Sequence, residues 1–281
     1  MNRKERRADR ARRAKLETAK LRAMSISDKG IPYTIRTLDG QPFWDAAAIF
    51  LIFTSAEGGK SQLVGTAFYT TRFGHFLTAK HVLMELHTKQ KNGFMIHMLD
   101  DDASAIVRKI TQSSPHPSAD IALGALDHPP GYILNAVPRL TTECPKVGEQ
   151  IVTVAFERKT GTFTPKGELL IAPTYFSGEF EEPHPQGRDP IMLPFPCYRT
   201  SISIPAGASG GPVFDSKGRV FGINCTGFDG TEVSYLARVE EALTLTAAGM
   251  RFGPDDVPTD RTLLEFVQTR HVVFVPEIST R

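Results

Sequence analysis

Short runs of apolar and β-branched residues recur along most of this chain, and turn-forming residues separate them. Such runs, with little helical pattern between them, are typical of strands in an all-β fold. In the first half they are AAIFLIFT at 47–54, QLVGTAFYT at 62–70, GHFLTAK at 74–80, FMIHML at 94–99, ASAIVRKITQ at 103–112 and ADIALGAL at 119–126. After a Pro/Gly break at 129–131 they are EQIVTVAF, GELLIAPTYF, MLPFPCYRTSISI, a hairpin over 211–226, and EVSYLARV. Two sets of about six strands predict two barrels and argue against an α/β sheet.

The two ends of the chain depart from this pattern. VEEALTLTAAG at 239–249 predicts a helix that stops at Gly249, and TDRTLLEFVQTRHVVFVP at 259–276 predicts a short capped helix and one more strand. We therefore divide the chain into a basic N-terminal tail (1–24), a double barrel (25–250) and a short, partly helical C-terminal extension (251–281). Within the double barrel, we expect barrel one at about 44–128 and barrel two at about 132–240.

The first 24 residues form a separate basic segment. They hold ten lysines and arginines against three acids, whereas the net charge of the whole chain is only +2. No apolar stretch follows them, so they do not resemble a secretory signal. The segment is either a solvated tail or a contact for nucleic acid, anionic lipid or an acidic partner.

Composition narrows the compartment and the chemistry. Three cysteines cannot form a disulfide framework, which favours a reducing, cytoplasmic location. The longest apolar run, 46–53, is too short to cross a membrane. The sequence contains neither an HExxH motif nor a paired cysteine motif, so we expect no metal and no other cofactor.

The segment PAGASGGPV at 205–213 carries the strongest chemical signal. A serine between glycines lies in tight backbone, where successive N–H groups can turn toward one point beside its hydroxyl. Two apolar runs around a Lys217-Gly218 turn follow, and they predict a β-hairpin. Ser209 is therefore a candidate nucleophile at the mouth of a strand pair.

A serine nucleophile needs an imidazole base, and that imidazole needs a carboxylate to orient it. Of the eight histidines, only His81 ends a strand-like run and begins a short helical pattern. His87 is the alternative within the same segment. Among the acids, Asp120 is flanked by apolar residues, so its carboxylate is poised to be half-buried and paired. The acidic cluster at 100–102 is better explained as a solvated turn.

TAKHV at 78–82, ADIAL at 119–123 and GASGGPV at 207–213, in the order His, Asp, Ser, resemble the chymotrypsin-like serine peptidases. The likeness extends to the bacterial HtrA-type branch through KVGEQIVTVAF at 146–156 and TSISIPAGASGGPVFDSKGRVFGIN at 200–224. It covers roughly residues 44–240. The resemblance implies a double Greek-key barrel with the active site between the barrels, and peptide-bond hydrolysis through an acyl-enzyme. The tail after the barrels is too short for the peptide-binding module (PDZ domain) that often follows in the HtrA-type branch.

The resemblance also implies a role for single positions. Ser209 would attack, His81 would act as base and then as acid, Asp120 would orient His81, and the N–H groups of Gly207 and Ser209 would hold the oxyanion. Members that are activated by cleavage carry an acid just before the serine, where this chain has Ala208. We therefore expect activity without N-terminal processing.

The pocket for the residue before the scissile bond would be set by Ser203 at its floor and Gly227 at its wall. Without an acid there, a medium apolar residue should be preferred over a cationic one. Asp229 is the acid that could reach the pocket from the next loop.

These features favour a serine endopeptidase with protein or peptide substrates. A non-catalytic barrel that binds peptides as a subunit of a larger complex is the alternative, although it would not need all three residues. A nucleic-acid-binding protein led by the basic tail ranks last, because the body of the chain lacks a nucleic-acid-binding motif.

Overall fold

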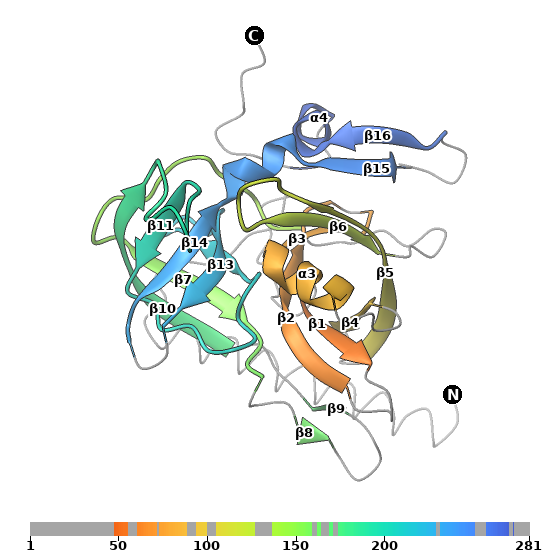
Figure 1. Cartoon of the computed structure of the whole chain (residues 1–281), viewed down its shortest axis with the longest axis horizontal. Coiled ribbons are helices and arrows are strands. Elements are labelled where there is room, and N and C mark those ends of the chain that lie inside the picture. The colour runs from red at the N-terminus through yellow and green to blue at the C-terminus, as the bar shows by residue number, and fades with distance from the viewer. Residues whose placement is uncertain are drawn as a thin grey trace, which may run out of the picture.

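A computed structural model describes residues 48–55, 61–71, 73–88, 94–99, 105–126, 137–158, 162–163, 169–170, 174–228, 231–250, 257–269 and 272. The basic tail and the rest of the first 47 residues lie outside this described part. Two closed barrels dominate the fold, and a small C-terminal unit lies beside them (Figure 1).

Barrel one is built from six antiparallel strands. They are β1 (Ile49–Ser55), β2 (Ser61–Tyr69), β3 (His75–Thr78), β4 (Phe94–Leu99), β5 (Ala105–Pro115) and β6 (Ala122–Leu126). Their order around the barrel is β1-β2-β3-β6-β5-β4. Because β3 pairs with β6 and not with β4, the connection is a Greek key. The helix α3 (Lys80–Thr88) follows β3 directly.

Barrel two repeats this topology. Its strands are β7 (Gln150–Ala155), β10 (Thr174–His184), β11 (Cys197–Thr200), β12 (Pro212–Phe214), β13 (Val220–Gly227) and β14 (Ser234–Arg238). Their order around the barrel is β10-β11-β14-β13-β12-β7. Counted from β7 as the first strand, this is the same Greek-key order as in barrel one. Two strands of two residues each, β8 (Thr162–Phe163) and β9 (Leu169–Leu170), pair with each other and lie between β7 and β10 in the chain. The predicted all-β double Greek-key barrel is confirmed.

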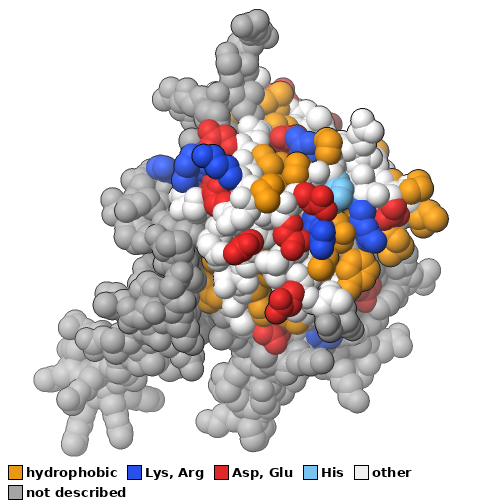
Figure 2. Space-filling view, turned by 90° about the vertical axis from the view of Figure 1, so that its left-hand side faces the viewer, with side chains coloured by type: hydrophobic (Ala, Val, Ile, Leu, Met, Phe, Trp, Pro, Cys, Tyr) orange, Lys and Arg blue, Asp and Glu red, His pale blue; other side chains and the backbone are white. Residues whose placement is uncertain are grey.

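The buried side chains explain why the apolar runs of the sequence form strands. β3 and β6 are buried along their whole length, because one face of each lines the barrel interior and the other is covered by further elements. A single apolar cluster runs through barrel one and into barrel two, and a second cluster around Phe180, Tyr198 and Phe221 fills barrel two. The outer face of barrel two instead carries charges of both signs close together (Figure 2). There Arg199 on β11 forms ion pairs with Glu181 and Glu182 on β10.

The C-terminal unit differs from its prediction. Where a helix over 239–249 was expected, a 3₁₀ helix, η1 (Val239–Thr244), is followed by the strand β15 (Thr246–Met250). The strand forms because β15 pairs with β16 (Thr259–Thr262). This partner lies further along the chain, so the local pattern of apolar residues does not predict the pairing. The predicted capped helix is present as α4 (Leu263–Gln268). The strand expected after it lies outside the described residues, apart from Val272.

Candidate active site

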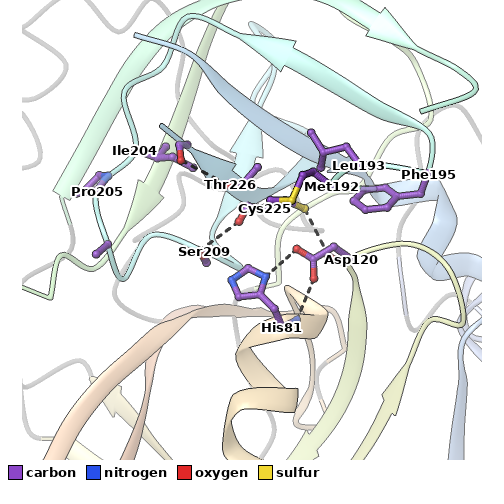
Figure 3. Close-up of a pocket in the computed structure, with 12 residues that line it drawn as sticks. His81, Asp120, Met192, Leu193, Phe195, Ile204, Pro205, Ser209, Cys225 and Thr226 are labelled. Carbon is purple, nitrogen blue, oxygen red and sulfur yellow. Dashed lines mark hydrogen bonds and ion pairs between the residues drawn. The ribbon is translucent and has the colours of Figure 1, made fainter. Parts of the chain in front are cut away.

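The three candidate residues come together at the seam between the barrels (Figure 3). His81 is the second residue of α3, and Asp120 lies just before β6, so both belong to barrel one. Ser209 lies in the loop between β11 and β12 of barrel two. The imidazole of His81 lies between Ser209 and the carboxylate of Asp120 (Figure 3). His87 is near the end of α3, and its side chain is outside the described set.

Asp120 holds His81 through two hydrogen bonds. The backbone N–H of His81 donates to Asp120 Oδ1 at 2.9 Å, and His81 Nδ1 lies 2.7 Å from Oδ2. Burial disfavours both charges, but the hydrogen bond and the attraction between the two groups outweigh it. The pKa of His81 is consequently raised, and the pKa of Asp120 is lowered. Such a pair fixes the His81 tautomer and stabilises an imidazolium.

The turn that carries Asp120 is anchored by its own neighbours. The ring of His116 accepts the N–H of Ala119 at 2.8 Å through Nδ1, and the backbone N–H of His116 donates to Ile121 O at 2.9 Å. Lys80, the residue before His81, donates from Nζ to the carbonyl of His116 at 2.7 Å. The helix that carries His81 is therefore tied directly to the turn that carries Asp120.

The loop around Ser209 leaves two backbone donors open. The N–H of Ala208 donates to Pro205 O, that of Gly210 to Asn224 O and that of Gly211 to Ala208 O. The N–H groups of Gly207 and Ser209 have no hydrogen-bond partner among the described residues. Two unpaired donors beside a serine hydroxyl can bind an oxyanion.

Glycine is required twice in this loop. Gly207 and Gly210 have φ of +101° and +87°, in the region that L side chains rarely adopt. A Cβ on Gly210 would also lie 2.2 Å from the carbonyl oxygen of Thr66 in barrel one. The glycines noted in the sequence thus let barrel two approach barrel one closely.

The hydroxyl of Ser209 faces the strand behind it. Its Oγ donates to the carbonyl of Cys225 at 3.4 Å, a long and weak hydrogen bond. Cys225 itself is buried, and burial raises the pKa of its thiol well above the ordinary value. Its neutral Sγ lies 3.5 Å from the backbone carbonyl of Asp120. Cys225 therefore packs beneath the site and is no candidate nucleophile.

A cavity of about 490 Å³ opens beside these residues. It is lined by His81, Asp120, Met192, Leu193, Phe195, Ile204, Pro205, Ala206, Ser209, Cys225, Thr226 and Gly227. Apart from the His81–Asp120 pair, no charged side chain of the described residues lines it.

The structure brings only one of the two predicted pocket residues to this cavity. Gly227 lines it, whereas Ser203 is exposed and lies outside it. Ile204 takes the place expected for Ser203, because successive residues of extended chain point to opposite sides. Ile204 also occupies the space left by Gly227: a Cβ there would lie 2.8 Å from Ile204 Cγ1. Asp229 lies outside the described residues.

Sequence reasoning missed the apolar wall formed by Met192, Leu193 and Phe195. These residues belong to a string, MLPFPCYRTSISI, that the pattern assigns to one strand. The two prolines in it were the available signal, since proline interrupts a strand ladder. Among the described residues, no group of His, Cys, Asp and Glu side chains could hold a metal ion. No helix in the described part of the chain is long and apolar enough to cross a membrane.

Two curated relatives are about a quarter identical to this chain over the stretches that align. It is 26% identical over 179 residues to "Protease Do-like 5, chloroplastic" of Arabidopsis thaliana, and 27% identical over 171 residues to "Probable periplasmic serine endoprotease DegP-like" of Pseudomonas putida. The matches cover 63% and 59% of this chain, but 52% and 29% of the relatives. The chain thus spans about half the length of the first relative and less than a third of the second.

Solved structures show the same fold. The HtrA-type protease AlgW with a tripeptide has a TM-score of 0.52 at 19% identity, over 70% of this chain and 58% of that one. Deg5 has a TM-score of 0.51 at 21% identity, over 69% and 85%. The active form of the Rv3671c protease from M. tuberculosis has a TM-score of 0.51 at 21% identity, over 70% and 78%.

The family assignment rests on a longer match. Residues 65–223, more than half of the chain, match the trypsin-like peptidase domain. This range runs from β2 to β13, so it takes in strands of both barrels and all three of His81, Asp120 and Ser209. The chain therefore belongs to the family of trypsin-like peptidase domains, and it is similar to Do-like and DegP-like proteases and, in fold, to an HtrA-type protease.

Proposed function

We propose that this protein is a serine endopeptidase in which Ser209, His81 and Asp120 form the catalytic triad. One observation carries the proposal: the His81–Asp120 pair and the loop of Ser209 meet at one cavity. The pair stabilises a charged imidazole, and the loop has two N–H donors without a partner among the described residues. HtrA-type relatives and family membership support the same class of reaction.

In the proposed reaction, the Ser209 hydroxyl turns from Cys225 to His81 and attacks the carbonyl carbon of the scissile bond. His81 takes the hydroxyl proton, and Asp120 stabilises the imidazolium that results. The N–H groups of Gly207 and Ser209 hold the oxyanion of the tetrahedral intermediate. His81 then gives its proton to the leaving amine, which leaves an acyl-enzyme. Water, activated by His81, hydrolyses the ester and restores Ser209.

A fluorophosphonate probe tests this proposal without knowledge of the substrate. Wild type should be labelled at Ser209, while Ser209→Ala and His81→Ala should each lose labelling. With a peptide substrate, each single variant should lower kcat by roughly 10⁴–10⁶, and the double variant should lose little more, because the members act as a unit. Equal labelling of wild type and His81→Ala would refute the assignment and direct attention to His87. An unlabelled, folded wild type that binds peptides would favour the non-catalytic barrel.

The cavity supports an apolar preference for the residue before the scissile bond. Ile204 narrows the pocket at Gly227, and burial of a cationic side chain there would lack a described partner. Apolar burial, at roughly 25 cal/mol/Å², instead favours Leu, Val or Met. Cleavage of a mixed peptide library, read by mass spectrometry, should show these residues before the cut, and Ile204→Ala should shift the preference to larger side chains. A dominant Arg or Lys would contradict this and point to Asp229.

A further inference from the structure

Thr66 of barrel one contacts the nucleophile loop of barrel two at two points. It lies in β2, it is fully buried, and its backbone N–H donates to Ser209 O at 2.8 Å. Its hydroxyl donates to Gly207 O at 2.8 Å. One buried side chain thus binds the same short loop that carries the nucleophile and the open N–H donors.

The direction of the Thr66 hydroxyl is fixed by a third segment. The backbone N–H of Phe156, just after β7, donates to Thr66 Oγ1 at 3.0 Å. Because this N–H donates to a lone pair of the hydroxyl oxygen, the hydroxyl proton is directed elsewhere and can be donated to Gly207 O. The carbonyl of Thr66 in turn accepts from Thr78 Oγ1 at 2.7 Å, which ties the residue to β3.

The neighbouring peptides show why the Gly207 carbonyl matters. The peptide between Ala206 and Gly207 has its carbonyl held by the N–H of Arg158 at 2.9 Å. In a planar trans peptide the N–H points opposite the carbonyl, so the open N–H of Gly207 points away from Arg158. The next peptide is held at both ends, by Thr66 at Gly207 O and by Pro205 at the Ala208 N–H. Gly207, with φ of +101°, lies between these two anchored peptides.

We infer that Thr66 is a positioning residue. From barrel one, its hydroxyl keeps the oxyanion donors of the barrel-two loop in place. A glycine has the widest conformational freedom of any residue, so without this anchor the peptide after Gly207, which is then held only through the Ala208 N–H, can rotate. Rotation of this peptide would change how the Gly207 N–H before it and the Ser209 N–H after it are placed relative to each other. The inference rests on the proposed peptidase function for its catalytic consequence, but the anchoring itself is a property of the fold.

The anchor should act on the transition state and not on substrate binding. An oxyanion donor is used fully only when the negative charge develops, so its misplacement lowers kcat and leaves KM nearly unchanged. Loss of one such donor outright lowers kcat by about 10²–10³ in comparable enzymes. Loss of its anchor should give a decrease of roughly 10- to 10³-fold.

Two matched variants separate the hydroxyl from the packing of Thr66. Thr66→Val keeps the shape and removes the hydroxyl, whereas Thr66→Ser keeps the hydroxyl. Thr70→Val is the control, since it removes another buried hydroxyl of barrel one, which donates to His75 O at 3.3 Å and not to the nucleophile loop. Thr66→Val should lower kcat by this factor with KM within about threefold, while Thr66→Ser and Thr70→Val should stay within about fivefold of wild type. Thr66→Ala replaces Thr66→Val if the latter does not fold.

Hydrogen exchange supplies a readout that does not depend on activity. The amides of 206–211 should exchange roughly tenfold faster in Thr66→Val than in Thr66→Ser, as expected for the loss of one buried hydrogen bond. Equal exchange in the two variants would overturn the inference whether or not the protein cleaves peptides. So would a rise in KM at constant kcat. A wild type that neither labels nor cleaves would defeat the proposed function alone, and the exchange experiment would still decide the role of Thr66.

Discussion

At the scale of single residues, the coupling between His81 and Asp120 governs how the site responds to pH. Burial disfavours the charged form of each group, but the hydrogen bond and charge of its partner outweigh this effect. His81 therefore holds its proton more tightly, and Asp120 gives its proton up more readily, than in water. In the proposed mechanism, the pair therefore favours the charged state that His81 reaches in the transition state. The same coupling requires that the resting His81 be deprotonated before it can act as a base.

As the pH is lowered, peptidase activity should consequently begin to fall at a pH above 6.5, the ordinary pKa of histidine. Asp120→Asn removes the charge that raises the His81 pKa, so the acid limb of kcat/KM should move to lower pH. The same variant should lower kcat by about 10⁴, because the asparagine leaves His81 in the wrong tautomer. Initial rates on one peptide across the pH range test both effects. An acid limb at the same pH in wild type and variant would contradict the coupling.

The motif residues were predictable because their chemistry demands particular residue types at particular places. His81, Asp120 and Ser209 meet at the site because a strand end, a strand start and a glycine-rich turn lie at the seam of two barrels. Ser203 could not be placed in the same way. Its position depends on which side of an extended segment faces the cavity, and that is set by the packing of Ile204 on Gly227.

At the scale of elements, apolar alternation located most strands but not their lengths. β10 extends to His184 through a polar stretch with Glu179, Glu181 and Glu182, where the pattern predicts no strand. Pairing with β7 and β11 on its two sides holds this stretch extended. The same reason explains β15: strand partners distant in sequence override a local helical pattern.

The helix α4 belongs structurally to barrel one, although it follows barrel two in the chain. Phe266 of α4 is fully buried in the main apolar cluster. Its ring stacks on the ring of His75 in β3, with the ring centroids 5.5 Å apart. β15 contacts β5 and β6, so the C-terminal unit covers the outer face of barrel one (Figure 1). This explains why β3 and β6 are buried on both faces.

Phe266→Ala should lower the free energy of unfolding by about 3–5 kcal/mol, the cost typical of removing a buried aromatic ring. Urea unfolding followed by fluorescence or circular dichroism measures this loss. Val257→Ala, at a position 79% exposed, is the matched control and should change stability by less than about 0.5 kcal/mol. A small effect at Phe266 would show that the C-terminal unit is not part of the cooperative core.

At the scale of the whole molecule, the two barrels have the same topology and meet at the seam that holds His81, Asp120 and Ser209. The loop of Ser209 is held by its own backbone, by β13 and by Thr66 of barrel one. Ala208 is fully buried at the position where cleavage-activated members of the family carry an acid. The described loop therefore has its hydrogen bonds in place without a charged partner from a new N-terminus.

The 281-residue chain should accordingly hydrolyse a suitable peptide without prior processing, with the basic tail intact. Mass spectrometry of the active sample verifies that no residue has been removed, and fluorophosphonate labelling of the same sample reports the activated serine. Ala208→Asp is the informative variant: it buries a carboxylate with no N-terminal amine to pair with, which should disrupt the loop and lower labelling. Activity that appears only after a cut before residue 48, where the described structure begins, would show instead that this loop is assembled by processing. In that case the open N–H groups of Gly207 and Ser209 would describe the processed state of the enzyme.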